Sequence, residues 1–553
     1  MRMELQHLRK SDVILFLLLL SLTILVRLPT LLEPWGADQA GFGYVAKGIL
    51  EGKVPYRDFY SLTGYGVFFT FALFFKLFGM KMMSIHLGHL LVSLLTVILV
   101  FLLTHRLFGR NVAFTAAFIY TIFSNGLAFS GFGYENKSAW GTYWYLAQRE
   151  VFMALLITGA VLLTTIKGSK GRKLLSFMCG LLIGLAAFYK VTATLMLFLF
   201  MGYIFFDEFS VSRRLLSLKL LGSLFSLLLG FILINLPFLY YFWTHDALKD
   251  VYQALFLHVS LYARISRGLR IETLFSGHYS ILSENLVLWL FSVISCLYIV
   301  FQDRTRNNLL IVFWTLLTLA MVWGQGKFFG YHFILLIPPF SILTAYGLHK
   351  FLLTGGGFKS FLRHNLCDIK KIFMLATIIL SIGAFCISNY DYYKRHIQLL
   401  TRKLSKSQYY EVFTEFPTHP YSFRADYQIV QYLREHRKTG DKLEVIFSAG
   451  DTIIHFLSGM EAVSRFIQSW YLFPSDEVLS KNKITIVLRD EFINQIIQVQ
   501  PQYILCVHIP LEELTRLPSL KDDTNVRKLD TFVHTNYELK TFPDNRFLFV
   551  KKT

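Results

Sequence analysis

The stretch TGYGVFFTFALFFKLFGM, residues 63–80, decides the topology of this chain. It is apolar apart from Lys76 and a few small polar residues, and it is long enough to be considered for a membrane span. If it crossed a bilayer, every later loop would change sides, and the basic loop at residues 167–173 would lie outside. We therefore expect a juxtamembrane or dipping helix on the outer side instead of a span.

The composition of the whole chain is that of a membrane protein. Of its 553 residues, 54% are hydrophobic and only 16% are charged, whereas a soluble globular domain carries about 25% charged residues. The formal charge of +19 would suggest nucleic acid as a partner of a soluble protein. Here many basic residues stand in short loops between apolar runs, which is the pattern that orients membrane proteins, so no nucleic-acid partner is expected.

The apolar runs predict a polytopic α-helical membrane protein of about 11–13 transmembrane helices, since about 20 residues of helix cross a bilayer core. Candidate spans lie at residues 13–32, 84–105, 111–130, 149–166, 174–189, 191–206, 215–242, 285–302, 309–324, 332–353 and 372–389. Placing the N-terminus in the cytoplasm puts the basic loops inside, as the positive-inside rule requires. The stretch 174–206 is expected to be two short helices with Lys190 at their outer turn, because a lysine at mid-bilayer is costly.

Two parts follow from this topology. Residues 1–390 form the membrane domain, in which residues 33–83 are the first outer loop. Residues 391–553 have mixed polar and apolar composition and predict an extracytoplasmic soluble α/β domain. Within it we expect a helix near residues 424–437 and strands at residues 443–447, 503–507 and 547–550.

The first outer loop holds the most informative carboxylate. From Phe42 the apolar residues recur with helical spacing, which predicts a short amphipathic helix in the plane of the membrane interface. Asp38 stands just before it, where a helix N-cap is expected. The same carboxylate is our candidate for a general base, and Glu150, at the start of a later span, is a candidate to assist it. Pairing with Arg149 or with the helix dipole is the structural alternative for Glu150.

Cationic and aromatic side chains gather on the same outer face. Lys190, Arg264 and Arg267 predict a phosphate or pyrophosphate site, and contact with lipid headgroups is an equally weighted alternative. Tyr331 and His332 follow Lys327 before a Pro-Pro pair, so this set could flank a lipid head and a sugar or could belong to an interfacial aromatic belt. No nucleotide-binding, metalloprotease or serine-hydrolase motif stands in a credible context.

The chain resembles the GT-C membrane glycosyltransferases, in particular the bacterial and archaeal relatives of protein O-mannosyltransferase and of the lipid A aminoarabinose transferase (glycosyltransferase family 39-like). The resemblance is carried by the loop from Asp38 through the segment VPYRDF at residues 54–59, by Arg149-Glu150, by Lys190 and by Tyr331-His332. It covers residues 1–390, and the tail is similar only in style, through residues 450–466.

The resemblance implies transfer of a sugar from a polyprenyl-phosphate or polyprenyl-pyrophosphate donor at the outer membrane face. Asp38 matches the catalytic acidic position and Lys190 a phosphate-binding lysine, and Tyr44 lies in the matching loop as a candidate substrate contact. The chain departs from the pattern at Gln39, where some branches have a second acid, and at residues 61–66, where close relatives carry a basic Pro-Pro element. Arg57 is a possible substitute for that missing phosphate contact.

Together these features predict an inverting glycosyltransferase with Asp38 as general base, whose acceptor is a hydroxyl of a protein, lipid or glycan. Three matters stay open. A divalent cation, Mg²⁺ or Mn²⁺, would have Asp38 and Glu150 as ligands, which is a poor site for such an ion. A transporter or flippase of lipid-linked sugars is the alternative function, although the inverted repeats typical of transporters are not seen. An assembly factor that kept the fold without activity is a third.

Overall fold

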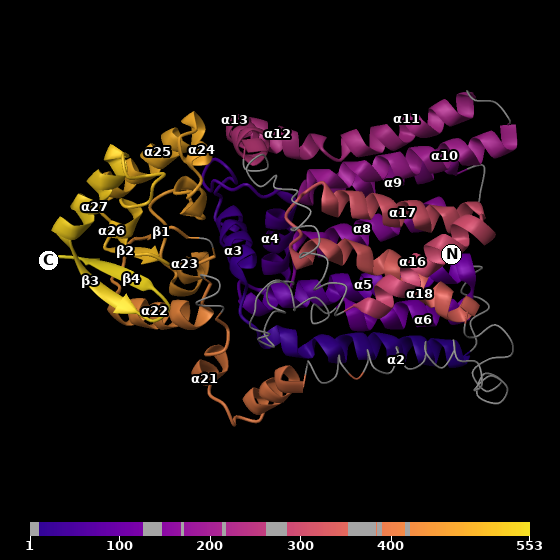
Figure 1. The fold of residues 1–553 in the computed structure, drawn as a ribbon, viewed down its shortest axis with the longest axis horizontal. Helices are drawn as coiled ribbons and strands as arrows, with labels where there is room; N and C mark the ends of the chain where they lie inside the picture. Colours follow the sequence, from indigo (N-terminus) through magenta and orange to yellow (C-terminus); the bar gives the residue numbers. More distant parts are fainter. Residues whose placement is uncertain are drawn as a thin grey trace.

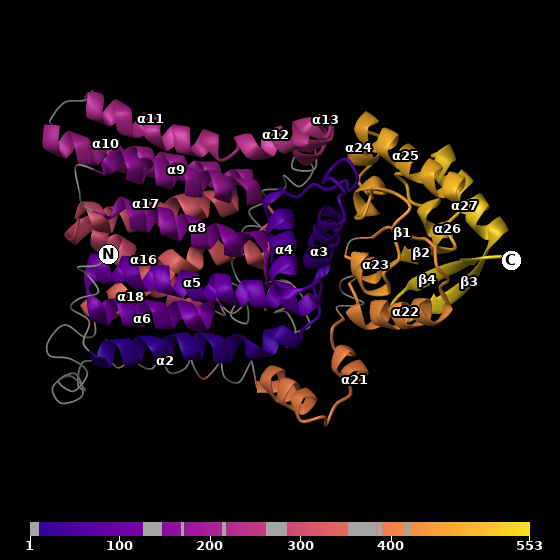
Figure 2. The same cartoon turned by 180° about the vertical axis from the view of Figure 1, so that it is seen from behind.

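The computed structural model describes residues 10–124, 146–166, 171–212, 217–261, 285–351, 383, 390–414, 421–448 and 450–552. It has two parts, a bundle of long helices and a smaller domain that contains the sheet at one end of that bundle (Figures 1 and 2). The described chain starts at the opposite end of the bundle, where the label N stands, and the C-terminus lies at the far side of the smaller domain (Figure 1).

The bundle is built from apolar helices that run alongside one another (Figures 1 and 2). Its elements are α2 (Lys10–Arg27), η1 (Leu28–Leu32), α5 (Met82–Phe108), α6 (Arg110–Phe123), α8 (Arg149–Thr164), α9 (Arg172–Tyr189), η3 (Val191–Leu195), α10 (Met196–Ser212), α11 (Leu218–Leu233), α12 (Leu236–Thr244), α13 (Leu248–Tyr252), η4 (Gln253–His258), α16 (Leu286–Gln302), α17 (Arg306–Trp323), η5 (Gly330–Leu336) and α18 (Ile337–Phe351).

Length and composition confirm a multi-pass membrane protein. Within the described residues, seven helical segments are long and apolar enough to cross a membrane. They are Lys10–Leu32, Met82–Phe108, Arg172–Tyr189, Val191–Ser210, Leu218–Thr244, Arg306–Trp323 and Gly330–Phe351. Helices α6, α8 and α16 run beside them but are shorter, with 14, 16 and 17 residues. The predicted span at residues 372–389 lies outside the described residues except for residue 383.

The stretch that decides the topology forms α4 (Gly66–Phe78), a helix of 13 residues. Together with α3 (Ala37–Leu50) it lies across the end of the bundle, roughly at right angles to the long helices (Figures 1 and 2). It does not run through the bundle, in agreement with the expectation that residues 63–80 are not a span. The side of the membrane that this helix and the later loops face stays a prediction.

Two expectations for α3 were wrong. The helix begins at Ala37, five residues before the periodic pattern, and its N-cap is Gly36; Asp38 is inside the first turn and caps nothing. The helix is also buried over most of its length, between α4 and the soluble domain, instead of lying with one face in lipid and one in water. The soluble domain covers the face of α3 that the apolar periodicity of the sequence assigned to solvent.

Lys190 separates two helices, as predicted. Helix α9 ends at Tyr189 and η3 starts at Val191, while Lys190 itself has an extended backbone with φ −159°. Helix α11 packs closely on α9, since a Cβ added to Gly180 would lie 2.0 Å from the Leu227 carbonyl oxygen. Only glycine allows that approach.

The soluble domain carries a mixed four-stranded sheet in the order β1-β2-β4-β3. Its strands are β1 (Leu443–Ile446), β2 (Tyr503–Val507), β3 (Tyr537–Phe542) and β4 (Arg546–Lys551). Strand β1 pairs parallel with β2, and β4 pairs antiparallel with both β2 and β3. The sheet confirms the soluble α/β domain and all three predicted strands. Strand β3 was not predicted, because its residues YELKTF are largely exposed and lack an apolar alternation.

Short helices surround this sheet. They are α21 (Lys406–Tyr410), α22 (Phe423–His436), α23 (Thr452–Ser458), η6 (Ser469–Leu472), α24 (Glu477–Ser480), α25 (Lys483–Val499), α26 (Leu511–Leu514) and α27 (Thr524–Asn536). Helix α22 matches the predicted helix at residues 424–437. It lies on one side of the sheet, while α25 and α27 lie on the other (Figures 1 and 2).

Candidate functional site

Five separate segments bring charged side chains together at the end of the bundle that faces the soluble domain. They are the first turn of α3, the start of α8, the break between α9 and η3, the loop between α17 and η5, and η5 itself. Their functional side chains are Asp38, Gln148, Arg149, Glu150, Lys190, Gln325, Lys327, Tyr331 and His332. We call this set the outer cluster.

Asp38 is held by its neighbours in the first turn and in α8. The Gln148 side-chain amide donates to Asp38 Oδ2 at 3.2 Å. Gln39, which replaces the second acid of some relatives, donates from Nε2 to the Leu146 carbonyl oxygen at 2.5 Å. The two glutamines therefore tie α3 to the start of α8. Among the described residues no side chain donates to the other oxygen of Asp38, so that oxygen is available to a substrate.

Glu150 and Lys190 form a buried ion pair. Lys190 Nζ donates to Glu150 Oε1 at 2.8 Å and also to the side-chain oxygen of Gln325. Glu150 is fully buried, and the Lys190 side chain is only 16% exposed. Burial lowers the pKa of Lys190 to about 8, although Glu150 acts in the opposite direction. Glu150 thus pairs with Lys190, and it also interacts electrostatically with Arg149, the partner that the sequence suggested.

Arg149 and Lys327 add two more cations. The Arg149 guanidinium lies over the Phe42 ring, 5.9 Å from its centroid, and is hydrogen-bonded with the Tyr331 side chain. Lys327 interacts electrostatically with Lys190, Arg149 and Asp38. Burial, with a smaller effect from the two neighbouring cations, lowers the pKa of Lys327 to about 7. The cluster thus opposes two carboxylates with three basic groups.

Several buried polar atoms of the outer cluster are not satisfied by the protein. In the part of the chain that the structure describes, Arg149 Nε, Glu150 Oε2 and His332 Nδ1 have no hydrogen-bond partner. Buried polar atoms are nearly always paired, so such a group calls for water or a ligand. The outer cluster has more basic groups than carboxylates, and the Arg149 Nε–H has no acceptor among the described residues. Such a site is suited to an anionic group such as a phosphate.

The predicted site residues fall into three groups. Asp38, Glu150, Lys190, Tyr331 and His332 are brought together in the outer cluster. Arg57 and Tyr44 have other partners: Arg57 binds Asp58 and the His245 carbonyl, and the Tyr44 hydroxyl accepts the Ala462 N–H at 3.0 Å. Arg264 and Arg267 lie outside the described residues.

The sequence did not single out Gln148 and Gln325 as site residues. Amide side chains carry no charge signal, and only the fold shows that one meets Asp38 and the other Lys190. Lys327 was noticed with its aromatic neighbours but was not assigned a role.

The outer cluster does not fit a divalent cation. Within the described residues, no three His, Cys, Asp or Glu side chains come together in a way that could hold a metal ion. One oxygen of Glu150 already binds Lys190, and Asp38 accepts from an amide. Hard cations prefer six or more oxygen ligands, and these two carboxylates are accompanied by cations instead.

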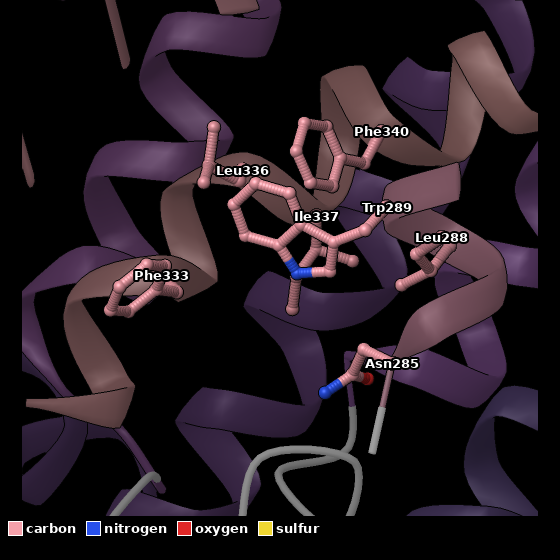
Figure 3. Close-up of a pocket in the computed structure, with 7 residues that line it drawn as sticks. All are labelled: Asn285, Leu288, Trp289, Phe333, Leu336, Ile337 and Phe340. Atoms are coloured by element: carbon pink, nitrogen blue, oxygen red, sulfur yellow. The ribbon is translucent and has the colours of Figure 1, made fainter. Parts of the chain in front are cut away.

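An apolar pocket lies between α16 and the η5–α18 segment (Figure 3). Its lining residues are Asn285, Leu288, Trp289, Phe333, Leu336, Ile337 and Phe340. The Trp289 indole lies across the middle of the view, and the Asn285 amide stands at one edge (Figure 3). Phe333 follows His332 in the chain, so the same 3₁₀ turn contributes to the outer cluster and to this apolar surface.

One family model and several solved structures are similar to this chain. The sequence model of the family described as "Dolichyl-phosphate-mannose-protein mannosyltransferase" matches residues 64–241, about a third of the chain. No curated protein sequence matches.

Among solved structures, ArnT from Cupriavidus metallidurans bound to undecaprenyl phosphate is similar with a TM-score of 0.54 and 14% identity, over 98% of each chain. The archaeal oligosaccharyltransferase AglB from Archaeoglobus fulgidus, in complex with an inhibitory peptide and a dolichol-phosphate, is similar with a TM-score of 0.51 and 12% identity, over 98% of this chain and 74% of that chain. The apo form of the Archaeoglobus fulgidus enzyme gives a TM-score of 0.52. These matches confirm the resemblance to the GT-C superfamily and its membrane fold.

Proposed function

We propose that this chain, which has the GT-C fold, is a glycosyltransferase that moves a sugar from a polyprenyl-phosphate or polyprenyl-pyrophosphate donor to an acceptor hydroxyl. The observation that carries the proposal is the outer cluster: one accessible carboxylate, Asp38, faces several buried cations at one end of a membrane bundle. The lipid phosphates in ArnT and AglB and the partial match to a mannosyltransferase family support the same donor class.

The reaction is a single displacement at the anomeric carbon. The acceptor oxygen forms a bond to that carbon while its proton passes to Asp38 acting as general base. The bond from the anomeric carbon to the phosphate oxygen breaks, and its electron pair leaves with the phosphate. Attack from the face opposite the leaving group inverts the anomeric centre.

The cations of the outer cluster stabilise the leaving phosphate. Arg149 Nε has no hydrogen-bond partner among the described residues, and Lys327 interacts electrostatically with Lys190, Arg149 and Asp38. Preformed positive groups in a site shielded from water stabilise the negative charge that develops as the bond breaks. Glu150 is then a positioning residue, because it holds Lys190.

We propose that the first part of the donor's hydrocarbon chain packs along the apolar surface shown in Figure 3, whose own cavity is too small to enclose it. It adjoins His332 through Phe333, and its lining is almost entirely apolar. A long isoprenoid gains about 0.8 kcal/mol for each CH₂ that leaves water, so an apolar surface beside a phosphate site suits an amphiphilic donor.

The decisive test is Asp38→Asn, which keeps the size of the side chain and removes its basicity. We expect sugar transfer to fall by about 10²- to 10⁴-fold, the usual contribution of a general base, while binding of the lipid donor is retained. The donor is supplied as a lipid extract from cells that lack the chain, in which unused lipid-linked sugar accumulates.

Glu51→Gln is the matched control, since Glu51 follows the other end of α3 and forms an exposed ion pair with Lys47. It should transfer sugar at the rate of the parent chain. If Asp38→Asn does so as well, Asp38 is not the general base. If deletion of the chain leaves lipid-linked sugar on the inner leaflet, the chain moves the lipid and does not transfer its sugar.

A further inference from the structure

The soluble domain makes a very close contact with the first turn of α3. A Cβ added to Gly450 would lie 2.2 Å from Ala37 Cβ and 2.3 Å from Ala37 Cα. Real Cβ atoms essentially never approach another atom within 3.0 Å, so only glycine allows this contact. Ala37 directly precedes Asp38, the carboxylate of the outer cluster.

Further contacts from the same domain follow α3 along its length. The Tyr421 hydroxyl donates to the Trp35 carbonyl oxygen, and the Trp35 ring lies 4.6 Å from the Phe456 ring, centroid to centroid. The Ala462 N–H donates to the Tyr44 hydroxyl at 3.0 Å. The soluble domain therefore contacts Trp35, which precedes the helix, the first helical residue Ala37 and the mid-helix residue Tyr44.

Behind Gly450 stands a buried ion network. Asp451 Oδ2 accepts the Gly450 N–H at 3.4 Å, and Asp451 Oδ1 accepts from Arg546 Nη2 at 2.9 Å. Arg546 Nε also donates to Asp426 Oδ1 at 2.8 Å. None of the three side chains is more than 1% exposed. The network links β4, α22 and the corner at residues 450–451, so the whole core of the domain supports the point that touches Ala37.

We propose that this corner positions the catalytic carboxylate: Gly450 and Asp451, braced by Arg546, set the first turn of α3 and through it the place of Asp38. The inference rests on the proposed role of Asp38 as general base. In this proposal the soluble domain contributes to the transfer step by holding the general base in place, in addition to any contact that it makes with the acceptor.

The physical reason is the sensitivity of proton transfer to distance. The base must lie within hydrogen-bond reach of the acceptor hydroxyl, and a displacement of about 1 Å far from the chemistry can cost about a hundredfold in rate. Gln148 holds Asp38 itself, and Gln39 ties the same turn to the residues before α8. The backbone contact at Ala37 adds a constraint from the soluble domain.

The test is Gly450→Ala. The new methyl group must push Ala37 away, so we expect kcat for sugar transfer to fall about 10- to 100-fold, with little change in the KM for the donor extract. Hydrogen exchange of the amides at residues 36–44 should become faster, while exchange in α25 stays as in the parent chain. This combination separates a local shift of α3 from unfolding.

A second variant, Asp451→Asn, keeps the size of the side chain but weakens the link to Arg546. It should give the same pattern in milder form. The control is Gly202→Ala, where an added Cβ meets nothing within 4 Å, and it should match the parent in rate and exchange.

The inference is overturned if Gly450→Ala transfers sugar at the parent rate, or if it loses activity only because exchange rises throughout the soluble domain. A failure of the proposed function looks different. In that case Asp38→Asn is as active as the parent, whatever Gly450→Ala does.

Discussion

Lys327 is the most strongly pH-sensitive cation of the outer cluster. Burial and the nearby charges of Lys190 and Arg149 lower its pKa to about 7, so its charge changes within the physiological range. Below this pKa the ammonium is protonated and attracts an anionic lipid. As the pH rises through 7 the ammonium loses its proton and the attraction weakens.

This predicts a pH-dependent affinity for lipid phosphate. If the bound state requires protonated Lys327, the Kd for a synthetic polyprenyl phosphodiester should rise about tenfold between pH 6 and pH 8, as proton linkage to a single group of pKa about 7 demands. A phosphodiester is chosen because its single charge is constant over this range. Binding can be followed by calorimetry or fluorescence in detergent.

Lys327→Arg is the control for this prediction, since arginine stays protonated over the whole range. Its Kd should be nearly constant up to about pH 7 and rise at most about twofold by pH 8, where Lys190 is half titrated. An equal slope in parent and Lys327→Arg would show that another group takes up the proton.

At the scale of single residues, charge is what the sequence could detect. Asp38, Glu150 and Lys190 were found because ionised groups beside apolar runs are costly and need a reason. Arg57 was a candidate to replace the phosphate contact that the family carries at residues 61–66, but the fold places it beside Asp58 and His245. Which charged side chains come into contact depends on how helices far apart in the chain pack against one another. No local sequence pattern predicts that packing.

At the scale of elements, α4 is placed by two glycines. A Cβ on Gly64 would lie 2.4 Å from the Phe188 carbonyl oxygen, and one on Gly66 would lie 2.9 Å from Phe188 Cβ. Thr70 and Tyr189 also share a hydrogen bond of 2.6 Å between their hydroxyls. The stretch at residues 61–66, where the family's basic Pro-Pro element is missing, thus seats α4 against the end of α9, next to Lys190.

Gly64→Ala should therefore disturb α4 and the turn that holds Lys190. We expect a loss of about 1–3 kcal/mol in stability, as for other overpacked contacts, and a higher KM for the donor extract. Thermal unfolding in detergent and initial transfer rates measure the two effects. Gly159→Ala is the control, because its Cβ would meet only ordinary contacts at 3.5 Å; a Gly64→Ala chain as stable and active as this control would contradict the role given to α4.

Elements with strong periodicity or length were predictable, and those shaped by a partner surface were not. The strand Tyr503–Val507 and the helix Phe423–His436 appear where apolar spacing indicated them. The start of α3 was predicted too late, because Gly36 caps the helix. The soluble domain also covers the early residues of α3. Rules based on side-chain caps predict neither a glycine N-cap nor burial against a second domain.

At the scale of the molecule, the fold predicts which parts face each side of the membrane. The sheet domain lies at one end of the helical bundle, and the other end of the bundle is far from it (Figure 2). At the end away from the sheet, Arg172 binds Asp207 at 2.6 Å and Glu208 at 2.8 Å, so α9 and α10 are joined there by ion pairs. We expect this end to be cytoplasmic and the soluble domain to be extracytoplasmic.

Cysteine labelling tests this orientation. Gln302→Cys, at the exposed end of α16, and Glu512→Cys, on the exposed surface of the soluble domain, are compared with the parent chain. A membrane-impermeant maleimide should label Glu512→Cys in intact cells and Gln302→Cys only after permeabilisation. The reverse result would invert the topology and would place the outer cluster in the cytoplasm.

The sequence alone determined the membrane class and the α/β tail, and it predicted that residues 63–80 do not form a span through the bundle. These follow from local quantities, namely the length of apolar runs and the side on which basic loops lie. It also indicated Asp38, Glu150 and Lys190 as a chemical centre. Only the tertiary structure decided that Lys190 pairs with Glu150, that Gln148 holds Asp38, and that the soluble domain presses Gly450 against α3. Those contacts join residues that are 40, 110 and 413 positions apart in the chain, and their geometry exists only once the bundle and the domain have packed together.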